Sequence, residues 1–529
     1  MGDIVNSPIV AVGEYLATSA NDGMVHIFKQ SGGDKRSYNL KLSYIPGTMP
    51  RKDIENKDST LAKELRAFAE KGYVGDRYGV DGGFVLRRIT DDQDKQKHFF
   101  MFGAMGLGGR GAYALDLTKA ENGDPTAVSL FDVKHDNNGK NSNNSVQLGY
   151  TVGTPQIGKT HDGKYAAFLA SGYATKDIDN SENKTALYVY DLESSGTLIK
   201  KIDVPGGKGG LSSPTLVDKD LDGIVDIAYA GDRGGNMYRF DLSGQDPNQW
   251  SVRTIFSGNK PITSAPAISQ LKDKRVVIFG TGSDLSEEDV DSKEIQHVYG
   301  IFDNDTDTGT AQDGQGKGLL EQKLEKDKDG KTLFLSDYKR SDGSGDKGWV
   351  VKLEAGQRVT VKPTVVLRTA FVTIHKYTGN DKCGAETAIL GINTADGGKL
   401  TKKSARPIVP ADNTAVAQYS GHKKTSSGKS IPIGCMEKDN GIVCPNGYVY
   451  DKPVNVRYLD EKKTDGFSTT ADGDAGGSGT FKEGKKPARN NRCFSRKGVR
   501  TLLMNDLDSL DITGPMCGMK RISWREVFY

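Results

Sequence analysis

Short apolar runs separated by glycine-rich turns recur along most of the chain. Each unit opens with a small residue, a proline and an aliphatic residue. It then passes through an apolar run that ends near glycine and, after a turn, an aromatic-rich run that ends in Asp-Leu or a similar pair. The clearest units span residues 7–28, 153–192, 213–242 and 264–303. Apolar runs of roughly four to eight residues bounded by glycine and proline predict strands. The pattern therefore predicts an all-β fold.

Two weaker units and a returning strand extend the repeat. The weaker units lie at 84–117 and 362–392, and a fourth strand follows two of the clear units, at 198–202 and 250–255. Four-stranded units that recur in this way are the blades of a β-propeller. We expect a modified β-propeller of about seven blades with long loop insertions, forming a single domain over residues 1–529.

The two ends of the chain are expected to meet in one blade. The chain enters its first repeat almost at once, with no leader segment before Ser7-Pro8, so we expect a piece of a longer exported protein. The run Lys520–Tyr529 has the composition of a strand but no neighbouring partner in the sequence. We expect it to complete the first blade, because such closure removes open sheet edges.

Two insertions interrupt the repeats. In the first, residues 48–75, helical spacing of apolar residues over 61–69 predicts a short amphipathic helix, capped by Ser59 or Thr60. The second, residues 401–500, holds 19 Lys and Arg residues against 10 Asp and Glu residues, a local net charge of +9. Its stretch Gly466–Gly484 is of low complexity, so we expect this insertion to be partly disordered.

The overall composition narrows the function classes. The formal net charge of the whole chain is only +3, which gives no global sign of nucleic-acid binding. No apolar run approaches the roughly 20 residues of a transmembrane helix. The 7 histidines form no cluster and no Ser-His-Asp pattern, so we expect no catalytic residues.

The cysteines indicate an oxidising compartment. The sequence suggests a hairpin between Cys435 and Cys444 that a disulfide could close, and a second bridge could join Cys493 to Cys517, which leaves Cys383. A zinc site is the alternative, but CxxC spacing and a nearby histidine cluster are both missing. We expect one or two disulfides, with the pairing open.

The sharpest chemical signal is the nine-residue stretch Asp218–Asp226, which reads DxDxDGxxD. Ca²⁺ takes six to eight oxygen ligands at about 2.3–2.6 Å, and a glycine at the sixth position allows the sharp turn that points side chains inward. Position 12 is Tyr229 rather than the Glu of a helix-flanked EF-hand, so this is an EF-hand-like loop between strands. The predicted Ca²⁺ ligands are the side chains of Asp218, Asp220, Asp222 and Asp226 and the backbone carbonyl of Ile224.

The alternative interpretation of this loop is an acidic hairpin turn without a metal. Four aspartates within nine residues repel one another unless a cation neutralises them, which favours calcium. Since the predicted ligand set uses every carboxylate, we expect a structural or regulatory site rather than a catalytic one.

Four segments carry a resemblance to a known family. They are the acidic loop, Cys444–Tyr450 (CPNGYVY), Leu502–Leu507 (LLMNDL) and the tail Arg521–Tyr529 (RISWREVFY). Together they resemble the C-terminal half of the PilC/PilY proteins, which are assembly factors and tip adhesins of type IV pili. The resemblance extends over essentially the whole chain, and the tail is similar to the neisserial PilC branch.

This resemblance implies a modified seven-bladed propeller with calcium in one blade, at the residues named above. It implies export through the periplasm to the outer membrane and the pilus tip. The implied role is to promote pilus extension against retraction and to mediate attachment to host cells. The implied partners are minor and major pilins and a host-cell surface receptor, with no nucleic acid.

The enzymatic alternative is a quinoprotein-type dehydrogenase. The motif Ala186–Leu192 (ALYVYDL) also occurs in the blades of quinoprotein dehydrogenases, which resemble one another in having a quinone beside an adjacent cysteine pair. The chain has no such cysteine pair, so we expect neither a quinone nor an enzyme.

The basic insertion keeps two interpretations. It is either a solvated loop or a contact for anionic host glycans, phospholipid or another pilus component. The candidate contacts are the pairs Lys402-Lys403, Lys423-Lys424, Lys462-Lys463 and Lys485-Lys486.

Overall fold

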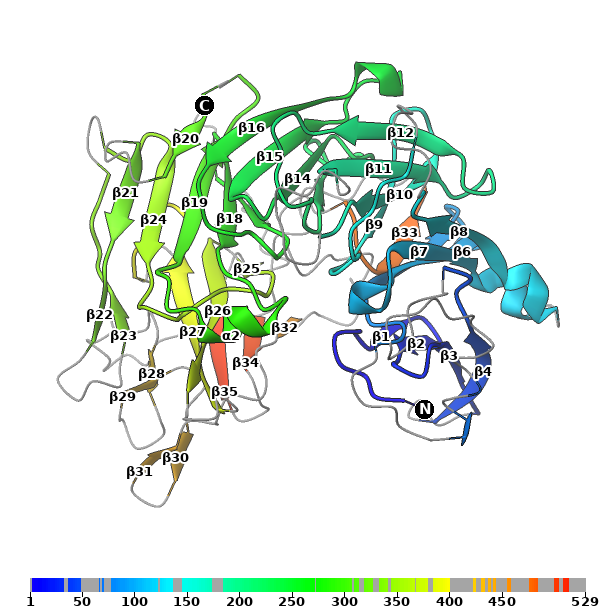
Figure 1. The fold of residues 1–529 in the computed structure, drawn as a ribbon, viewed down its shortest axis with the longest axis horizontal. Helices are drawn as coiled ribbons and strands as arrows, with labels where there is room; N and C mark the ends of the chain where they lie inside the picture. Colours follow the sequence, from blue (N-terminus) through cyan, green and yellow to red (C-terminus); the bar gives the residue numbers. More distant parts are fainter. Residues whose placement is uncertain are drawn as a thin grey trace, which may run out of the picture.

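The computed structural model confirms an all-β, propeller-like fold in which sheets follow one another in chain order around a ring (Figure 1). The structure describes residues 2–32, 37–48, 66, 69–70, 78–121, 124–136, 145–173, 184–271, 273–306, 309–313, 318–326, 333–340, 344–366, 368–378, 384–399 and 475–483. It also describes strand segments at 422–424, 430–432, 436–438, 441–443, 454–457, 499–503 and 508–512.

Within these residues, seven sheets have three or more strands, which we number as blades 1 to 7 in chain order. Blade 1 consists of β1 (Val10–Val12), β2 (Tyr15–Ser19), β3 (Val25–Gln30) and β4 (Tyr38–Tyr44). Blade 2 consists of β5 (Phe84–Thr90), β6 (Gln96–Ala104), β7 (Gly111–Asp116), β8 (Ser129–Lys134) and β33 (Gly479–Lys482). Blade 3 consists of β9 (Gln156–Lys159), β10 (Tyr165–Ala170), β11 (Ala186–Asp191) and β12 (Leu198–Asp203).

Blades 4 and 5 each have five strands. Blade 4 consists of β13 (Thr215–Val217), β14 (Ile227–Gly231), β15 (Asn236–Asp241), β16 (Ser251–Ser257) and β20 (Ala311–Gln312). Blade 5 consists of β17 (Ala267–Gln270), β18 (Arg275–Gly280), β19 (His297–Asp303), β24 (Gly348–Lys352) and β21 (Leu319–Gln322).

Blades 6 and 7 have three strands each among the described residues. They consist of β25 (Thr364–Val366), β26 (Thr369–Thr378) and β27 (Gly384–Asn393), and of β32 (Val454–Arg457), β34 (Val499–Leu503) and β35 (Asp508–Ile512). Three hairpins pair β22 (Leu324–Lys326) with β23 (Leu333–Leu335), β28 (His422–Lys424) with β29 (Ser430–Pro432), and β30 (Met436–Lys438) with β31 (Gly441–Val443). Short helical turns are η1 (Gly106–Gly108), η2 (Leu117–Glu121), η3 (Pro125–Val128), η4 (Pro247–Gln249) and α2 (Glu287–Asp291).

The apolar strands are explained by burial on both faces. Five hydrophobic clusters each lie between one blade and the next, from blades 1 and 2 to blades 5 and 6. In β10, Phe168 packs toward blade 4, whereas Leu169 packs toward blade 2. Since successive side chains of a strand point to opposite faces, a strand sandwiched between two blades must be apolar at nearly every position.

Three of the strands that the sequence did not predict join their sheets from segments outside the repeat units. They are β20, β21 and β33, and each pairs in parallel with its neighbour. An antiparallel hairpin repeat gives no signal for a parallel strand that arrives from elsewhere in the chain.

Residues 475–483 of the low-complexity stretch Gly466–Gly484, which we call the strap, have a defined place on the ring. Its residues Gly479–Lys482 form β33 and pair with Arg87–Thr90 of β5. The physical reason is that the open edge of β5 supplies backbone hydrogen bonds and that Phe481 packs against the cluster between blades 2 and 3.

Several other expectations concern segments that lie partly or wholly outside the described residues. The hairpin between Cys435 and Cys444 is confirmed as β30–β31, but all five cysteines lie outside the described residues. Of the segment 48–75, residue 48 lies at the end of a described stretch, and the only others described are Arg66, Ala69 and Glu70, which are helical. The tail 520–529 also lies outside the described residues, and blade 1 has four strands from residues 10–44. No helix among the described residues is long and apolar enough to cross a membrane.

Candidate metal loop and its surroundings

The acidic loop joins the first two strands of blade 4, as its sequence predicts. The strands β13 and β14 pair from Thr215 opposite Tyr229 to Val217 opposite Ile227. The N–H of Asp226 donates to the carbonyl of Val217 at 2.8 Å and closes the loop. The ends of the loop are therefore fixed by a buried sheet.

The turn itself directs carboxylates inward. Gly223 has a φ of +90°, in the region that favours glycine, and Leu221 has a φ of +61°. The Asp218 carboxylate accepts hydrogen bonds from the N–H of Gly223 at 2.6 Å and the N–H of Asp222 at 3.2 Å. The Asp222 carboxylate accepts from the N–H of Ile224 at 2.8 Å. These bonds hold the two carboxylates at the inside of the turn.

Three of the four predicted carboxylates converge. Oxygen atoms of Asp218, Asp220 and Asp222 lie within 4.8 Å of one another. Two ligands of one Ca²⁺ at the usual distances are at most about 5 Å apart, so this donor set fits a single hard cation. The geometry suits calcium without being specific for it.

Asp226, the fourth predicted carboxylate ligand, is turned onto other partners. Its Oδ1 lies 2.8 Å from Nε2 of His161, and its Oδ2 accepts the N–H of Lys219 at 2.7 Å. Ile224, the predicted carbonyl ligand, pairs with Lys159 in an isolated parallel bridge. His161 and Lys159 both belong to blade 3, so the loop is braced by its neighbouring blade. Sequence reasoning missed His161 because it lies 65 residues from Asp226.

The electrostatics of the loop favour a cation. Burial raises the pKa of Asp218 to about 7, against an ordinary value of 3.8. The neighbouring Asp222 carboxylate and the hydrogen bond with Asp220 contribute to this same increase, whereas the N–H donors of Gly223 and Asp222 oppose it. A buried carboxylate with this tendency to stay neutral is stabilised in its charged form by a nearby positive charge.

An ion-pair network links the loop to blade 5. Lys219 Nζ lies 3.4 Å from Asp305, whose carboxylate also pairs with Arg239 at 2.9 Å and Arg275 at 2.6 Å. Burial alone would raise the pKa of Asp305, but the hydrogen bond from Arg239 and the charge of Arg275 outweigh it and lower the pKa to about 2. The adjacent Asp303 is buried and pairs with Arg239 at 2.6 Å.

The strap contacts the loop directly. A Cβ placed on Gly223 would lie 2.8 Å from Cε2 and 2.9 Å from Cζ of Phe481. The Phe481 ring therefore lies against the backbone of the turn at the position where only glycine fits.

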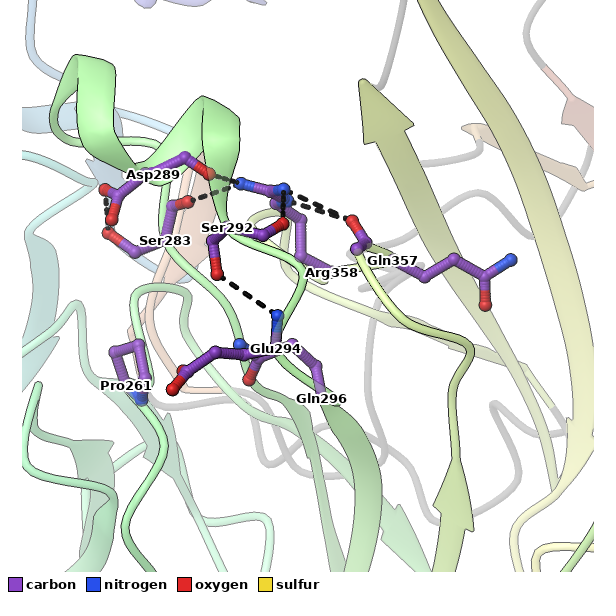
Figure 2. Close-up of a pocket in the computed structure, with 9 residues that line it drawn as sticks. Pro261, Ser283, Asp289, Ser292, Glu294, Gln296, Gln357 and Arg358 are labelled. Atoms are coloured by element: carbon purple, nitrogen blue, oxygen red, sulfur yellow. Dashed lines mark hydrogen bonds between the residues drawn. The ribbon is translucent and has the colours of Figure 1, made fainter. Parts of the chain in front are cut away.

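A second polar site is a small pocket beside α2, and its central residue, Arg358, has a structural role. Figure 2 shows the Arg358 side chain pointing at carbonyl groups at the end of α2. Arg358 is 3% exposed and donates to the carbonyls of Asp289, Ser292 at 3.1 Å and Gly356 at 3.2 Å. Because these carbonyls engage the guanidinium, we assign Arg358 to the stabilisation of this turn rather than to ligand binding.

Together, the fold and the loop define an all-β propeller-like protein with an EF-hand-like acidic loop in one blade. Residues 1–339 match the family described as PilY1 beta-propeller domain. This match covers blades 1, 3 and 4, blade 2 without β33 and blade 5 without β24, and the chain belongs to this family.

Curated relatives carry the same designation. The chain is 32% identical over 358 residues to the type IV pilus biogenesis factor PilY1 of Pseudomonas aeruginosa strain UCBPP-PA14. The matched region covers 58% of this chain and 29% of the relative. The chain is also 28% identical over 319 residues to a PilY1 homolog of Xylella fastidiosa, and this matched region covers 55% of this chain and 19% of the relative. The chain thus spans less than a third of the length of these relatives.

A solved structure supports the fold. The crystal structure of the Pseudomonas aeruginosa PilY1 C-terminal domain superposes with a TM-score of 0.59 at 21% identity, covering 94% of this chain and 92% of that one. At this identity the likeness establishes the fold alone.

Proposed function

We propose that this chain is the calcium-binding propeller of a type IV pilus biogenesis factor. The observation that carries the proposal is the convergence of Asp218, Asp220 and Asp222 in one blade of a propeller of the PilY1 family. The names of the relatives describe pilus biogenesis factors, which supports a role in assembly rather than in catalysis.

The three converging carboxylates would hold the cation, together with the predicted ligands Asp226 and the carbonyl of Ile224. Calcium, when bound, supplies positive charge that offsets the repulsion among these carboxylates. The chain itself supplies the rigid frame, because β13 and β14 fix both ends of the loop. The function of the site is therefore to stiffen the side of blade 4 that carries the loop.

In the cell, the proposed role is to promote pilus extension against retraction and to mediate attachment to host cells. The proposed locations are the pilus tip, the cell surface and the outer membrane. The proposed partners are pilins and a host-cell receptor, and neither quinone nor nucleic acid is expected to bind. This role would tie pilus dynamics to extracellular calcium, because removal of the cation would loosen one edge of blade 4 and with it a surface for partners.

Calorimetric titration of the full 529-residue chain with CaCl₂ tests the binding site. We expect the wild type to bind calcium and both Asp222→Ala and Asp220→Ala to lose this binding. Asp273→Ala is the matched control, since Asp273 is a carboxylate with a 75% exposed side chain outside the loop, and it should bind as the wild type does. Wild-type binding that survives Asp222→Ala would place the cation elsewhere.

The cellular role needs a separate assay. A strain whose full-length protein carries Asp222→Ala should show impaired pilus extension or excess retraction. Normal pilus dynamics in that strain would contradict the calcium-dependent role, even if the purified chain binds calcium. Pull-down of minor pilins with and without a chelator would then show whether the loop affects the pilin contact.

A further inference from the structure

The strap lies across the inner strands of three consecutive blades. Figure 1 shows β33, in orange, beside β9 on the inner side of the ring. The first strands of blades 2, 3 and 4 contact one another in turn. The strap pairs with β5 in blade 2, lies against Gln156 of β9 through Gly476, and donates the N–H of Ala475 to the carbonyl of Leu216 in β13 at 3.1 Å.

Specific contacts hold both ends of β33 within the strap. The N–H of Leu86 donates to Oγ of Ser478 at 3.0 Å at the start of β33. The N–H of Glu483 donates to the carbonyl of Thr90 at 2.8 Å at its end. The Glu483 carboxylate accepts hydrogen bonds from Lys97 and from the hydroxyl of Tyr165, and these bonds lower its pKa.

Phe481 connects the strap to the acidic loop. Its ring is half-buried, with the Arg87 guanidinium 5.4 Å from its centroid and the Tyr165 ring 6.2 Å away in an edge-to-face arrangement. The ring also lies against Gly223, whose N–H is the closest donor to the Asp218 carboxylate. The ring therefore backs the peptide that orients one of the three converging carboxylates.

We propose that cation binding at the acidic loop and docking of the strap are energetically coupled, so that loop occupancy sets how firmly residues 475–483 are held on the ring. This inference rests on the proposed calcium binding. Without a cation, mutual repulsion of the carboxylates favours a wider turn, and widening the turn displaces Gly223 from Phe481. With a cation the turn is fixed, and Phe481 packs on a fixed surface.

The coupling is reciprocal by thermodynamic necessity. If calcium strengthens strap docking by some factor, then removing the strap contact must weaken calcium binding by the same factor. Couplings between neighbouring sites commonly amount to about 5-fold to 150-fold in affinity. We expect a factor near the lower end of this range, about 5-fold or somewhat more, because the contact is a single ring on a single peptide.

Hydrogen exchange of the full chain measures the strap directly. In the wild type, amides of residues 475–483 should exchange at least about 5-fold more slowly with CaCl₂ than with a chelator. In Asp222→Ala the two conditions should give the same exchange. Amides of β10, which lie in the buried core of blade 3, serve as the internal reference.

Calorimetry measures the reciprocal effect. Phe481→Ala should weaken calcium binding by the same factor, and Thr480→Ala should not, since Thr480 lies on the same strand with an exposed side chain. If Phe481→Ala does not fold, Phe481→Leu reports on the same contact, because it keeps an apolar side chain but removes the ring.

The outcomes separate the two proposals. If the wild type binds calcium, but exchange of the strap and the affinity of the Phe481 variants are unchanged, the coupling is overturned and calcium binding stands. If the wild type binds no calcium, the proposed function fails and the coupling fails with it.

Discussion

The joint between blades 4 and 5 should depend strongly on one buried carboxylate. Asp303 has a side chain that is 2% exposed and accepts hydrogen bonds from Arg239 at 2.6 Å, Arg253 at 2.9 Å and the hydroxyl of Tyr229. Asp305, two residues on, pairs with Arg239 and Arg275 but is 47% exposed. Asp303→Asn and Asp305→Asn make the same chemical change at a buried and at a half-exposed position.

Their magnitudes should differ. Breaking a buried pair by neutralising one partner costs about 3–5 kcal/mol, because the other charge remains buried. Arg239 keeps Asp305 as a partner, so we expect the lower end, about 3 kcal/mol, for Asp303→Asn. Exposed pairs contribute about 0.2–1 kcal/mol each, so we expect about 1 kcal/mol for Asp305→Asn.

Hydrogen exchange in β15 and β19 is the suitable assay, because a ring of blades need not unfold in one step. A difference of about 2 kcal/mol corresponds to roughly 30-fold in protection of these amides. Equal protection in the two variants, with both near the wild type, would refute the reasoning that burial of Asp303 determines its contribution. Unfolding in urea at saturating calcium provides an independent comparison.

Three further predictions concern the loop, acid stability and the core. Gly223→Ala combines a φ of +90° with a clash against Phe481 and should weaken calcium binding in calorimetry, whereas Gly163→Ala, at φ +83° with no atom within 4 Å, should not. Because Asp305 has a pKa lowered to about 2 from 3.8, its stabilisation is complete above pH 4 and is lost as pH falls toward 2. The difference in unfolding free energy between wild type and Asp305→Asn should therefore shrink as pH falls from 4 and vanish only below pH 2. Trp349→Ala, at a fully buried ring that donates to the carbonyl of Thr394 at 2.8 Å, should cost about 3–5 kcal/mol in denaturant unfolding.

The features that could be predicted from the sequence are those that are local or periodic. The acidic loop is complete within nine residues. The position of its glycine predicts the sharp turn at Gly223, which has a φ of +90°. The blades were predicted because both faces of their strands are buried, which gives apolar runs such as that of β10 at a regular repeat. Neither inference needs knowledge of distant contacts.

What the sequence did not reveal depends on long-range geometry. The strap has the composition of a linker, and its order comes from the edge of β5, some 390 residues away in the chain. His161 lies in a hairpin turn of blade 3 that contains no metal-binding pattern of its own. Because the ring brings the inner strands of successive blades together, residues from three blades surround a loop that the sequence presents as self-contained.

The role of Asp226 can be decided through His161. The Asp226 carboxylate is held by His161 at 2.8 Å, so joining the cluster of Asp218, Asp220 and Asp222 requires that this hydrogen bond be broken. A hydrogen bond to a charged group at a partly exposed position contributes about 1 kcal/mol, which is roughly 5-fold in affinity.

If Asp226 is a calcium ligand, as its place in the motif predicts, His161→Ala should raise calcium affinity about 5-fold in calorimetry at fixed pH. An unchanged affinity would mean that Asp226 stays outside the ligand set. A weaker affinity would mean that His161 positions Asp226 for the cation, which contradicts the competition argued here. Asp226→Asn completes the comparison, because it should weaken binding only in the first case and in the last.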